Sequence, residues 1–428
     1  MIVFLKKVRV KTVFSAFEPV VTEPLELCYL KAVLNGMNIE NYVIDELLGL
    51  TQPHVEPNIV VLTGYNVAEE EIIKQAHWYK AKYPLVKIIV GGVHIQCNPV
   101  EFHVKDIDYI CHTQSLNVFK TLIEKIINMD ETISIDGVDC LVDGVESAEK
   151  YWCVGNKQII YNTENILADR SIFKQVSNRF HYLEKKNVAL IKGSVGCPFN
   201  CSYCYCKQLN SSHYVKANYE KMIDEMANIH ADYFWIVDDV LFSQRSDAIE
   251  FIDIIIKRKI KIKIIGYLRA DFILREKDLL GKLRQAGLIE VIVGFEATNN
   301  SELQAYEKTT NALDYPKVIS LIKENNIDLT ALFMVQPNYE TSDFVNLYKF
   351  IKHNRIQVFT VSILTPIKGT EDYELLKNNL ITRNPEKFDF LHLVLAPKLP
   401  KWLFYTLFYS IHLRMIPSKR VWKYIFKK

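Results

Sequence analysis

Six strand-then-helix units follow one another from Val188 onward, and this repeat limits the fold more than any other feature of the chain. Short runs rich in β-branched and aromatic residues alternate with longer helical patterns, an order typical of parallel sheets. The predicted strands are Ala189–Gly193, Tyr233–Val237, Ile262–Tyr267, Ile289–Gly294, Leu329–Val335 and Phe359–Leu364. We therefore expect a partial (β/α)6 TIM-like barrel, with its chemistry at the carboxyl ends of the strands.

The first part of the chain alternates β-rich and helical segments in the same way, which predicts a second α/β unit, an N-terminal doubly wound flavodoxin-like domain. Its expected strands are Val8–Ser15, Glu40–Ile44, Asn58–Thr63, Val86–Val90 and Asp108–Cys111, and its expected helices are Pro24–Leu34, Val67–Lys82 and Leu116–Ile127. Open sheets of this kind bind ligands beyond the carboxyl ends of their strands. Gly91 and Gly92 stand at such an end, where they either let a flat ligand approach the backbone or simply turn the chain.

Three cysteines lie on the predicted loop after the first barrel strand. Cys197, Cys201 and Cys204 are separated by three and then two residues. Thiolates hold iron–sulfur clusters, and a cubane normally takes four of them, so three would leave one iron without a protein ligand. A structural zinc site usually consists of two separated ligand pairs, and no second pair follows here. Three cysteines within eight residues cannot all pair comfortably as disulfides.

The pattern Cys-x-x-x-Cys-x-aromatic-Cys, with Tyr203 as the aromatic residue, resembles the cluster loop of the radical S-adenosylmethionine (radical SAM) superfamily. The resemblance implies that Cys197, Cys201 and Cys204 ligate a [4Fe–4S] cluster whose open iron chelates S-adenosylmethionine. It also implies that an electron from the reduced cluster cleaves the sulfonium and yields a 5′-deoxyadenosyl radical. We expect Cys206, two residues further on, to be a neighbouring thiol that does not bind the cluster.

Charged residues stand where the predicted barrel strands end, and the resemblance gives several of them a role in binding S-adenosylmethionine. Asp239 aligns with the acidic residue that receives the ammonium group; for it or the adjacent Asp238, helix capping is the alternative. Arg269 would bridge the cofactor carboxylate, or else form a salt bridge with Asp271 or Glu296. The segment around Glu296, "VGFEATNNSELQAYEK", is similar to one that contacts the ribose.

The segments "EPLELCYLKAVLNG", "IIVGGVHIQCNPVEF" and "DIDYICH" are similar to the cobalamin-binding domain fused ahead of many radical SAM enzymes. The resemblance implies a cobalamin bound against Gly91 and Gly92. No Asp-x-His-x-x-Gly motif is present, so no histidine is expected as a lower cobalt ligand. If a histidine did bind cobalt, His94 would be the first candidate, because it lies two residues after Gly92. Two stretches depart from the family: His112–Ser115 replaces the usual Gly-Glu-Gly-Glu, and Gln336 stands where a glycine is usual.

Composition bears on location and partners. Nine cysteines without signs of secretion indicate a reducing compartment, so we expect a cytoplasmic protein.

The net charge of +2 hides an asymmetry: Ala396–Lys428 holds eight Lys and Arg but no Asp or Glu, which leaves 52 − 8 = 44 basic against 50 acidic residues elsewhere. A uniformly basic surface for nucleic acid is therefore not expected. The apolar run Trp402–Leu413 is too short to span a bilayer, which takes about 20 residues; it either covers the open side of the barrel or lies at a membrane surface.

These observations predict four parts: a cobalamin-binding-like domain (1–130), a linker (131–185), a radical SAM domain (186–375) and a helical, basic C-terminal extension (376–428). The resemblance implies cobalamin-dependent methylation of an unactivated carbon in a small-molecule or lipid-like substrate, with an electron donor such as flavodoxin or ferredoxin. The alternative is a cobalamin-independent cyclisation, dehydration or rearrangement, with a degenerate N-terminal domain. A third alternative, a non-catalytic iron–sulfur or zinc protein, accounts less well for the acidic strand ends of a six-unit barrel.

Overall fold

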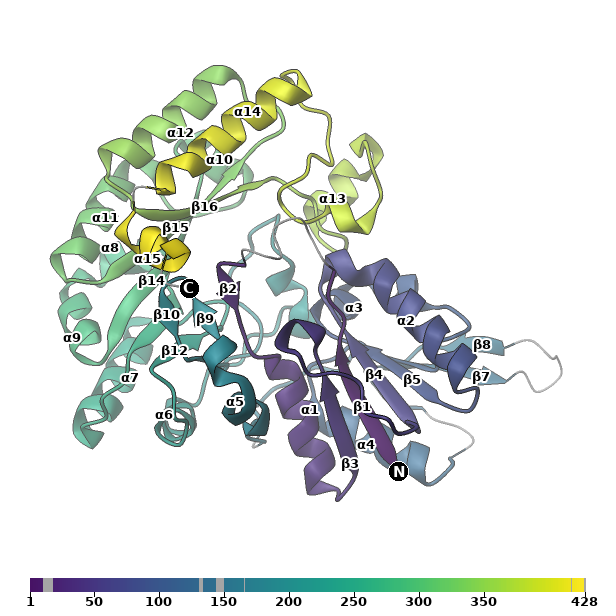
Figure 1. Cartoon of the computed structure of the whole chain (residues 1–428). Helices are drawn as coiled ribbons and strands as arrows, with labels where there is room; N and C mark the ends of the chain where they lie inside the picture. Colours follow the sequence, from purple (N-terminus) through teal and green to yellow (C-terminus); the bar gives the residue numbers. More distant parts are fainter. Residues whose placement is uncertain (11–17, 131–133, 144–149, 165, 417, 427–428) are drawn as a thin grey trace.

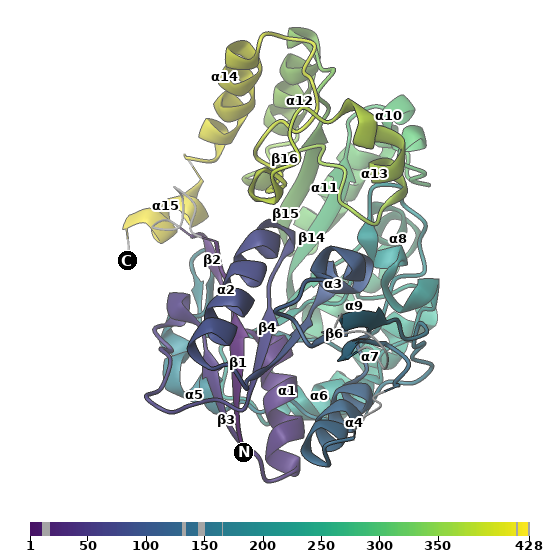
Figure 2. The same cartoon turned by 90° about the vertical axis from the view of Figure 1, so that its right-hand side faces the viewer.

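Two α/β lobes lie side by side in the computed structural model, each built around its own largely parallel sheet (Figure 1). The structure describes residues 1–10, 18–130, 134–143, 150–164, 166–416 and 418–426. Figure 2 shows that the helices at the carboxyl end of the chain, α14 and α15, lie along one flank of the molecule.

The first lobe contains a seven-stranded sheet in the order β3-β1-β4-β5-β6-β7-β8. Its strands are β1 (Ile2–Lys7), β3 (Glu40–Ile44), β4 (Ile59–Thr63), β5 (Lys87–Gly91), β6 (Tyr109–Cys111), β7 (Val138–Asp143) and β8 (Lys150–Cys153). The strands from β3 to β6 are parallel, and β7 and β8 are antiparallel additions. Helices α1 (Leu25–Gly36) and α4 (Leu116–Ile127) cover one face, and α2 (Glu69–Lys82) and α3 (Val93–Cys97) cover the other. The expected doubly wound arrangement is confirmed.

The first strand differs from its prediction. It begins at Ile2 and ends at Lys7, whereas Val8–Ser15 was expected; Val8–Val10 lie outside any strand, and residues 11–17 lie outside the described part. The physical reason is that two lysines inside the strand have partners: Lys6 Nζ donates to Gln75 at 3.0 Å, and Lys7 pairs with Glu26. The sheet also continues through β7 and β8, past residue 130, into the segment predicted as a linker.

The second lobe is a half-barrel of six parallel strands in sequential order, with β11 and β16 at its two edges. Its strands are β11 (Val188–Ile191), β12 (Tyr233–Ile236), β13 (Ile264–Tyr267), β14 (Leu288–Glu296), β15 (Asp328–Val335) and β16 (Val358–Ile363). Its helices are α6 (Tyr219–Ala227), α7 (Arg245–Arg258), α8 (Ala270–Arg275), α9 (Leu280–Gln285), α10 (Asn300–Ala305), α11 (Tyr315–Glu324) and α12 (Thr341–His353). The predicted partial (β/α)6 barrel is confirmed.

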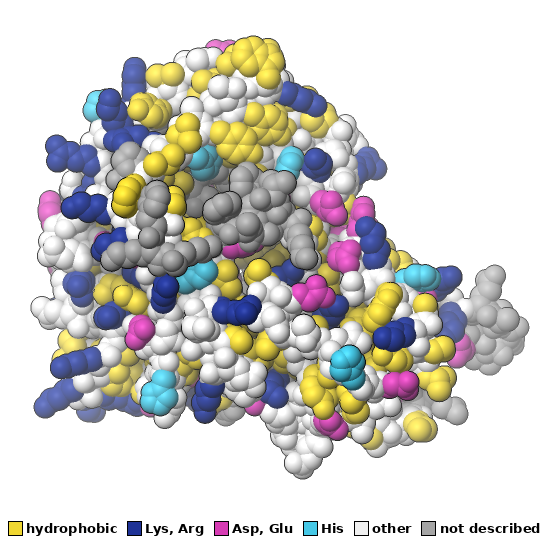
Figure 3. Space-filling view, viewed as in Figure 1, with side chains coloured by type: hydrophobic (Ala, Val, Ile, Leu, Met, Phe, Trp, Pro, Cys, Tyr) yellow, Lys and Arg dark blue, Asp and Glu magenta, His cyan; other side chains and the backbone are white. Residues whose placement is uncertain are grey.

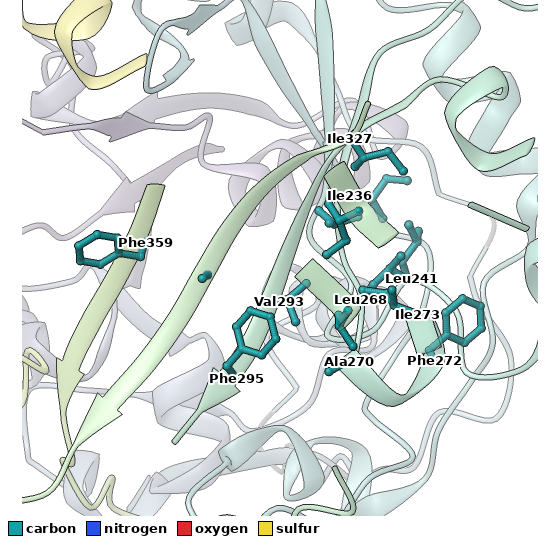
Figure 4. Close-up of a cluster of buried hydrophobic side chains, with 14 of the residues drawn as sticks. Ile236, Leu241, Leu268, Ala270, Phe272, Ile273, Val293, Phe295, Ile327 and Phe359 are labelled. Atoms are coloured by element: carbon teal, nitrogen blue, oxygen red, sulfur yellow. The ribbon is translucent and has the colours of Figure 1, made fainter. Parts of the chain in front are cut away.

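A large apolar core between the strands and the outer helices fixes the strand ends of the half-barrel. Figure 4 shows part of it, where Ile236, Val293 and Phe295 from the strands meet Phe272 and Ile273 from α8. All five side chains are buried. Burying one such side chain contributes about 1.5–3 kcal/mol, so the loops that leave these strands start from firmly held positions.

Three smaller elements complete the chain. A short antiparallel sheet of β2 (Val20–Val21), β9 (His181–Tyr182) and β10 (Lys185–Lys186) lies with α5 (Ser171–Val176) between the lobes. After α13 (Glu371–Leu376), helix α14 (Lys401–His412) packs on α12 and β16, and so covers one edge of the half-barrel. Helix α15 (Lys419–Phe426) follows. Within the described residues, no helix combines the length and apolar character needed to cross a membrane.

Candidate active site

The loop that carries the three cysteines is held at its start by a buried carboxylate. Asp238 follows β12 and is 1% exposed; its Oδ1 accepts from the backbone N–H of Gly193 at 2.7 Å and its Oδ2 from that of Ser194 at 2.9 Å. Because both oxygens are used on backbone amides, Asp238 orders the chain directly after β11. The expected alternative role was helix capping, but the two amides belong to the loop after β11 and not to a helix.

The three thiols are half-buried, unpaired by disulfides and close to one another. Burial raises the pKa of the Cys197 thiol to about 11, and the charges of Cys204 and Cys201 add to this shift. The pKa of Cys204 is lowered, chiefly by a hydrogen bond from Cys206. No group of three His, Cys, Asp or Glu side chains in the described ranges is tight enough for a single metal ion. An all-thiolate donor set is the one that holds iron–sulfur clusters in proteins.

Asp239, next to Asp238, has an unsatisfied oxygen. Its Oδ1 accepts from the Sγ of Cys206 at 3.2 Å, whereas its Oδ2 is buried and has no hydrogen-bond partner among the described residues. A buried carboxylate oxygen without a donor is costly. The adjacent acids are therefore not equivalent: Asp238 is saturated by backbone, and Asp239 has room for a donor from a ligand such as an ammonium group.

Glu296 joins the cysteine loop to the fourth strand of the half-barrel. Its backbone has φ +63° at a bulge where β14 ends. Its Oε1 accepts from the hydroxyl of Tyr203 at 3.1 Å and from Lys308 Nζ at 2.9 Å. The Tyr203 ring meets Tyr306 edge-on at 5.4 Å, and the Tyr306 hydroxyl accepts from Gln336. The tyrosine of the cysteine motif is thus held from two strands, and Tyr306 is a member of this network that the sequence analysis did not identify.

Arg269 is engaged by the protein in this structure. Its Nη2 donates to Asp271 Oδ2 at 2.9 Å and to Thr309 Oγ1 at 2.9 Å, and its guanidinium carbon lies 3.8 Å from the ring centre of Phe199 in the cysteine loop. The salt bridge to Asp271 that was expected as an alternative is present. A contact with a cofactor carboxylate stays a prediction for this residue.

Residues of the first lobe meet the half-barrel at the carboxyl edge of their sheet. Gly92 has φ +122°, and a Cβ there would lie 2.7 Å from Thr63 Oγ1, so this turn requires glycine. His94, two residues on, is buried with its Nε2 at 2.7 Å from Glu69 Oε2. Lys368, from the loop after β16, donates to Glu69 Oε1 at 3.0 Å. The His94 imidazole is therefore held by Glu69, the same carboxylate that binds Lys368 of the half-barrel.

A second observation brings this edge close to the cysteine loop. Burial raises the pKa of Cys97, at the end of α3, to about 11, and the charge of Cys204 contributes to the shift while Lys157 opposes it. Helix α3 also packs against Leu209–Ser212, the segment that begins five residues after Cys204.

A cavity of about 640 Å³ lies beside the amino end of α4, next to His112–Ser115, the stretch that differs from the family sequence. Ser115 and Glu164 form one wall, with the Ser115 hydroxyl donating to Glu164 at 2.6 Å. Asn210 of the cysteine loop donates to the Ile160 carbonyl at 2.7 Å, which ties the cavity wall to that loop. The cavity is lined by Ser115, Asn117, Val118, Thr121, Ile135, Gln158, Ile159, Ile160, Tyr161, Asn162, Thr163, Glu164 and Ile166.

A sequence model of the radical SAM superfamily matches residues 191–351, from the end of β11 into α12. Residues 191–351 therefore form a radical SAM domain. The matched region contains the three cysteines, both acids after β12, Arg269 and Glu296.

Relatives of this chain with known names are distant. The hopanoid C-3 methylase of Methylococcus capsulatus is 25% identical over 217 residues, which cover 51% of this chain and 42% of the methylase. The anaerobic magnesium-protoporphyrin IX monomethyl ester cyclase of Synechocystis sp. is 23% identical over 382 residues, which cover 85% of this chain and 74% of the cyclase. The chain thus spans less than half the length of the hopanoid methylase.

Solved structures match both lobes of this protein together. The methyltransferase TsrM from Kitasatospora setae, with cobalamin and a [4Fe–4S] cluster bound, superposes with a TM-score of 0.70 at 14% identity, covering 97% of this chain and 91% of TsrM. The cobalamin-dependent enzyme OxsB with aqua-cobalamin bound gives a TM-score of 0.62 at 16% identity, covering 96% of this chain and 61% of OxsB. The two-lobed fold is therefore that of cobalamin-binding radical SAM proteins.

Proposed function

We propose that this protein is a radical SAM enzyme that uses a [4Fe–4S] cluster, S-adenosylmethionine and cobalamin to methylate an unactivated carbon of its substrate. The observation that carries the proposal is the meeting of two carboxyl edges: α3 of the first lobe packs against Leu209–Ser212, which follows the cysteine loop, and Lys368 of the half-barrel donates to Glu69. Ligands of open α/β sheets and of barrels bind at these edges. A site shared by both edges suits a reaction that needs two large cofactors.

The chain's own residues would bind the cofactors and orient them. When bound, the cofactors would supply the electron, the adenosyl radical and the methyl group. The three thiols would hold the cluster, and the unpartnered Oδ2 of Asp239 would accept from the ammonium of S-adenosylmethionine. Glu296, fixed by Tyr203 and Lys308, would accept from ribose hydroxyls. A carboxylate prepositioned by charge-assisted hydrogen bonds binds without reorganising.

The substrate we propose is an apolar, lipid-like molecule, and the electron donor a flavodoxin or ferredoxin. Relatives named for hopanoid and for bacteriochlorophyllide methylation support the first part of this proposal. The cysteine loop lies at an edge of the half-barrel, which suits both substrate entry and electron transfer.

A second candidate function is a cobalamin-independent cyclisation, dehydration or rearrangement. The observation that favours it is the amino end of α4, where the protein's own Glu164 accepts from Ser115 and from the backbone N–H of Leu116 at 2.7 Å. These contacts occupy the hydrogen-bond donors of Ser115 and Leu116, which would otherwise be available to a ligand beside the altered loop His112–Ser115. Three relatives are named as magnesium-protoporphyrin IX monomethyl ester cyclases, over 84–87% of this chain.

Anaerobic reconstitution with iron, sulfide and hydroxocobalamin tests the proposal. We expect bound cobalamin, an electron paramagnetic resonance signal of the reduced cluster, and release of 5′-deoxyadenosine from S-adenosylmethionine. The triple variant of Cys197, Cys201 and Cys204 to alanine should lose the iron, whereas the matched control Cys206→Ala should keep it. Full iron in the triple variant would refute the cluster assignment, and an intact cluster without cobalamin retention would favour the second candidate.

A further inference from the structure

Helix α14 presents apolar side chains on two opposite sides. On the inner side, Phe404, Phe408 and Ile411 are buried at the spacing of a single helix face and pack on α12 and β16. The outer side remains apolar in α14 and in the turn that follows. Its exposed members are Trp402 (71%), Tyr409 (41%), Leu413 (62%) and Ile416 (48%). Spacings of seven, four and three residues place these side chains on one stripe. Packing on the half-barrel accounts only for the inner side.

Helix α15 has the same two-sided character. On its inner side, Arg420 pairs with the fully buried Glu290 at 2.7 Å, and Tyr424 stacks on His181 with the ring centres 5.8 Å apart. On its outer side, Trp422 is 55% exposed and Ile425 is 44% exposed. The inner contacts fix α15 against the protein, so its outer aromatic and aliphatic side chains are held facing solvent.

Cations without counter-charges flank this apolar surface. The segment Ala396–Lys428 contains eight Lys and Arg and no Asp or Glu. Two of these cations are neutralised from elsewhere, because Lys398 pairs with Glu340, and Arg420 with Glu184 and Glu290. Among the described residues, those with no ion pair are Lys401, Arg414, Lys419 and Lys423.

The two outer sides belong to one flank of the molecule. In Figure 1 both helices face the viewer, and after the turn to Figure 2 both lie along the left edge. In the space-filling view from the side of Figure 1, hydrophobic side chains gather over α14 with Lys and Arg at their margins (Figure 3). We call the exposed residues of these two helices and the turn between them the α14–α15 surface.

We propose that the α14–α15 surface docks this protein on the surface of an anionic lipid bilayer. Exposed tryptophan and tyrosine with flanking lysines and arginines are the composition of helices that lie in the membrane interface. Anionic headgroups attract each nearby Lys or Arg, and the attraction fades within a Debye length. Neither helix is long enough to span a bilayer, so the contact is peripheral. This inference is independent of the proposed function.

The same observations argue against a protein partner or a second copy of this chain. Protein interfaces are depleted of lysine at their centres, whereas Lys419 and Lys423 lie beside the exposed Trp422. Binding to a second copy through the same surface would also bring the uncompensated cations of both copies together. A lipid surface is the one class of partner that matches the apolar stripe and the cations at once.

Vesicle sedimentation with the full-length chain tests this docking surface. The protein is mixed with phosphatidylcholine vesicles, with or without phosphatidylglycerol, at low and at high salt. We expect binding only when the anionic lipid is present, and less of it at high salt. The double variant Lys419→Glu, Lys423→Glu should lower the partition coefficient by more than about tenfold, because each cation near an anionic surface contributes roughly a fivefold factor. Trp402→Ser should lower it at both salt concentrations.

The matched control is Trp78→Ser, Lys82→Glu on α2, where a 44% exposed tryptophan lies under a lysine at 4.9 Å. It should leave vesicle binding unchanged, and thermal unfolding should show that all variants fold. The proposal is overturned by wild-type protein that does not sediment with anionic vesicles, or by an equal loss of binding in the control. A dimer in light scattering that Trp402→Ser converts to monomer would also overturn it, in favour of a second copy of the chain.

Discussion

At the scale of single residues, neighbouring side chains of one type have different surroundings. Both carboxylate oxygens of Asp238 accept hydrogen bonds from the backbone N–H groups of Gly193 and Ser194, whereas Asp239 has one buried oxygen without a donor. Burial raises the pKa of Asp238, and the two backbone N–H groups oppose that shift. One acid therefore shapes the cysteine loop, and the other is available to a ligand.

This difference predicts opposite phenotypes for two conservative substitutions. Asp239→Asn should leave folding and iron content intact and weaken S-adenosylmethionine binding by about 10–100-fold, the effect of losing a charge-assisted hydrogen bond of about 1.5–3 kcal/mol. Asp238→Asn should instead lower thermal stability and iron retention, because an amide nitrogen cannot accept from a backbone N–H. Isothermal titration and iron analysis of both variants decide the matter; an unchanged cofactor affinity in Asp239→Asn would contradict the assignment.

Sequence reasoning identified the residue types of this site but not their partners. The cysteine spacing and the acids at strand ends can be read from the chain because they are local. The ion pair of Arg269 with Asp271, and the contact of Tyr306 with Gln336 and Tyr203, depend on how loops from different strands pack. Long-range packing of this kind leaves no local pattern, so the sequence left two roles open for Arg269, of which the structure shows the salt bridge to Asp271.

At the scale of elements, buried parallel strands were predictable because they are continuous apolar runs. All six barrel strands lie within a few residues of their predicted bounds. The first strand of the other lobe was misplaced because its two lysines looked like an end, although Lys6 and Lys7 have polar partners that let them enter the sheet. The short strands β7 and β8 were missed, since six and four residues of mixed polar and apolar character resemble a linker.

The turn after β5 is sensitive to a single added methyl group. Gly92→Ala should destabilise the fold by about 1–3 kcal/mol, because its φ of +122° suits glycine alone and the added Cβ would approach Thr63 Oγ1 to 2.7 Å. Gly36→Ala, at the end of α1 with no atom within 4 Å of the added Cβ, is the matched control and should be neutral or slightly stabilising. Urea unfolding measures both; equal stability of the two variants would refute the argument.

The attachment of α15 is testable in the same way. Arg420 pairs with Glu290 and Glu184, and Glu290 is fully buried. Arg420→Ala should therefore cost about 1.5–3 kcal/mol of unfolding free energy, the contribution of a charge-assisted hydrogen bond, because Glu290 keeps its ion pair with Lys185 at 2.7 Å. Lys419→Ala, one residue earlier and exposed, should change stability by less than about 0.5 kcal/mol. Chemical denaturation of the two variants tests whether the helix is packed through its inner side only.

At the scale of the whole molecule, the two lobes are joined through a buried acid. Glu69 on α2 meets His94 of its own lobe and Lys368 of the half-barrel, with Lys368 also 3.3 Å from Glu101. Burial pushes the pKa of Glu69 upward, but the hydrogen bonds and charges of His94 and Lys368 outweigh this and leave the pKa below its ordinary value of 4.5. The lobes are therefore held together most firmly when Glu69 is ionised.

The sign of this shift fixes how stability should change with pH. A carboxyl whose pKa is lower in the folded state stabilises the fold above its unfolded pKa, and that contribution is lost as the pH falls through the folded value. Glu69→Gln should therefore be less stable than the parent protein near neutral pH, by about 1.5–3 kcal/mol, and the difference should shrink as the pH falls below 4.5. Glu70→Gln, exposed on the same helix beside Lys74 at 3.6 Å, should follow the parent throughout. Thermal unfolding from neutral to acid pH gives the comparison. A difference between Glu69→Gln and the parent that persists unchanged at acid pH would show that the link between the lobes rests on side-chain shape and not on the ionised carboxylate.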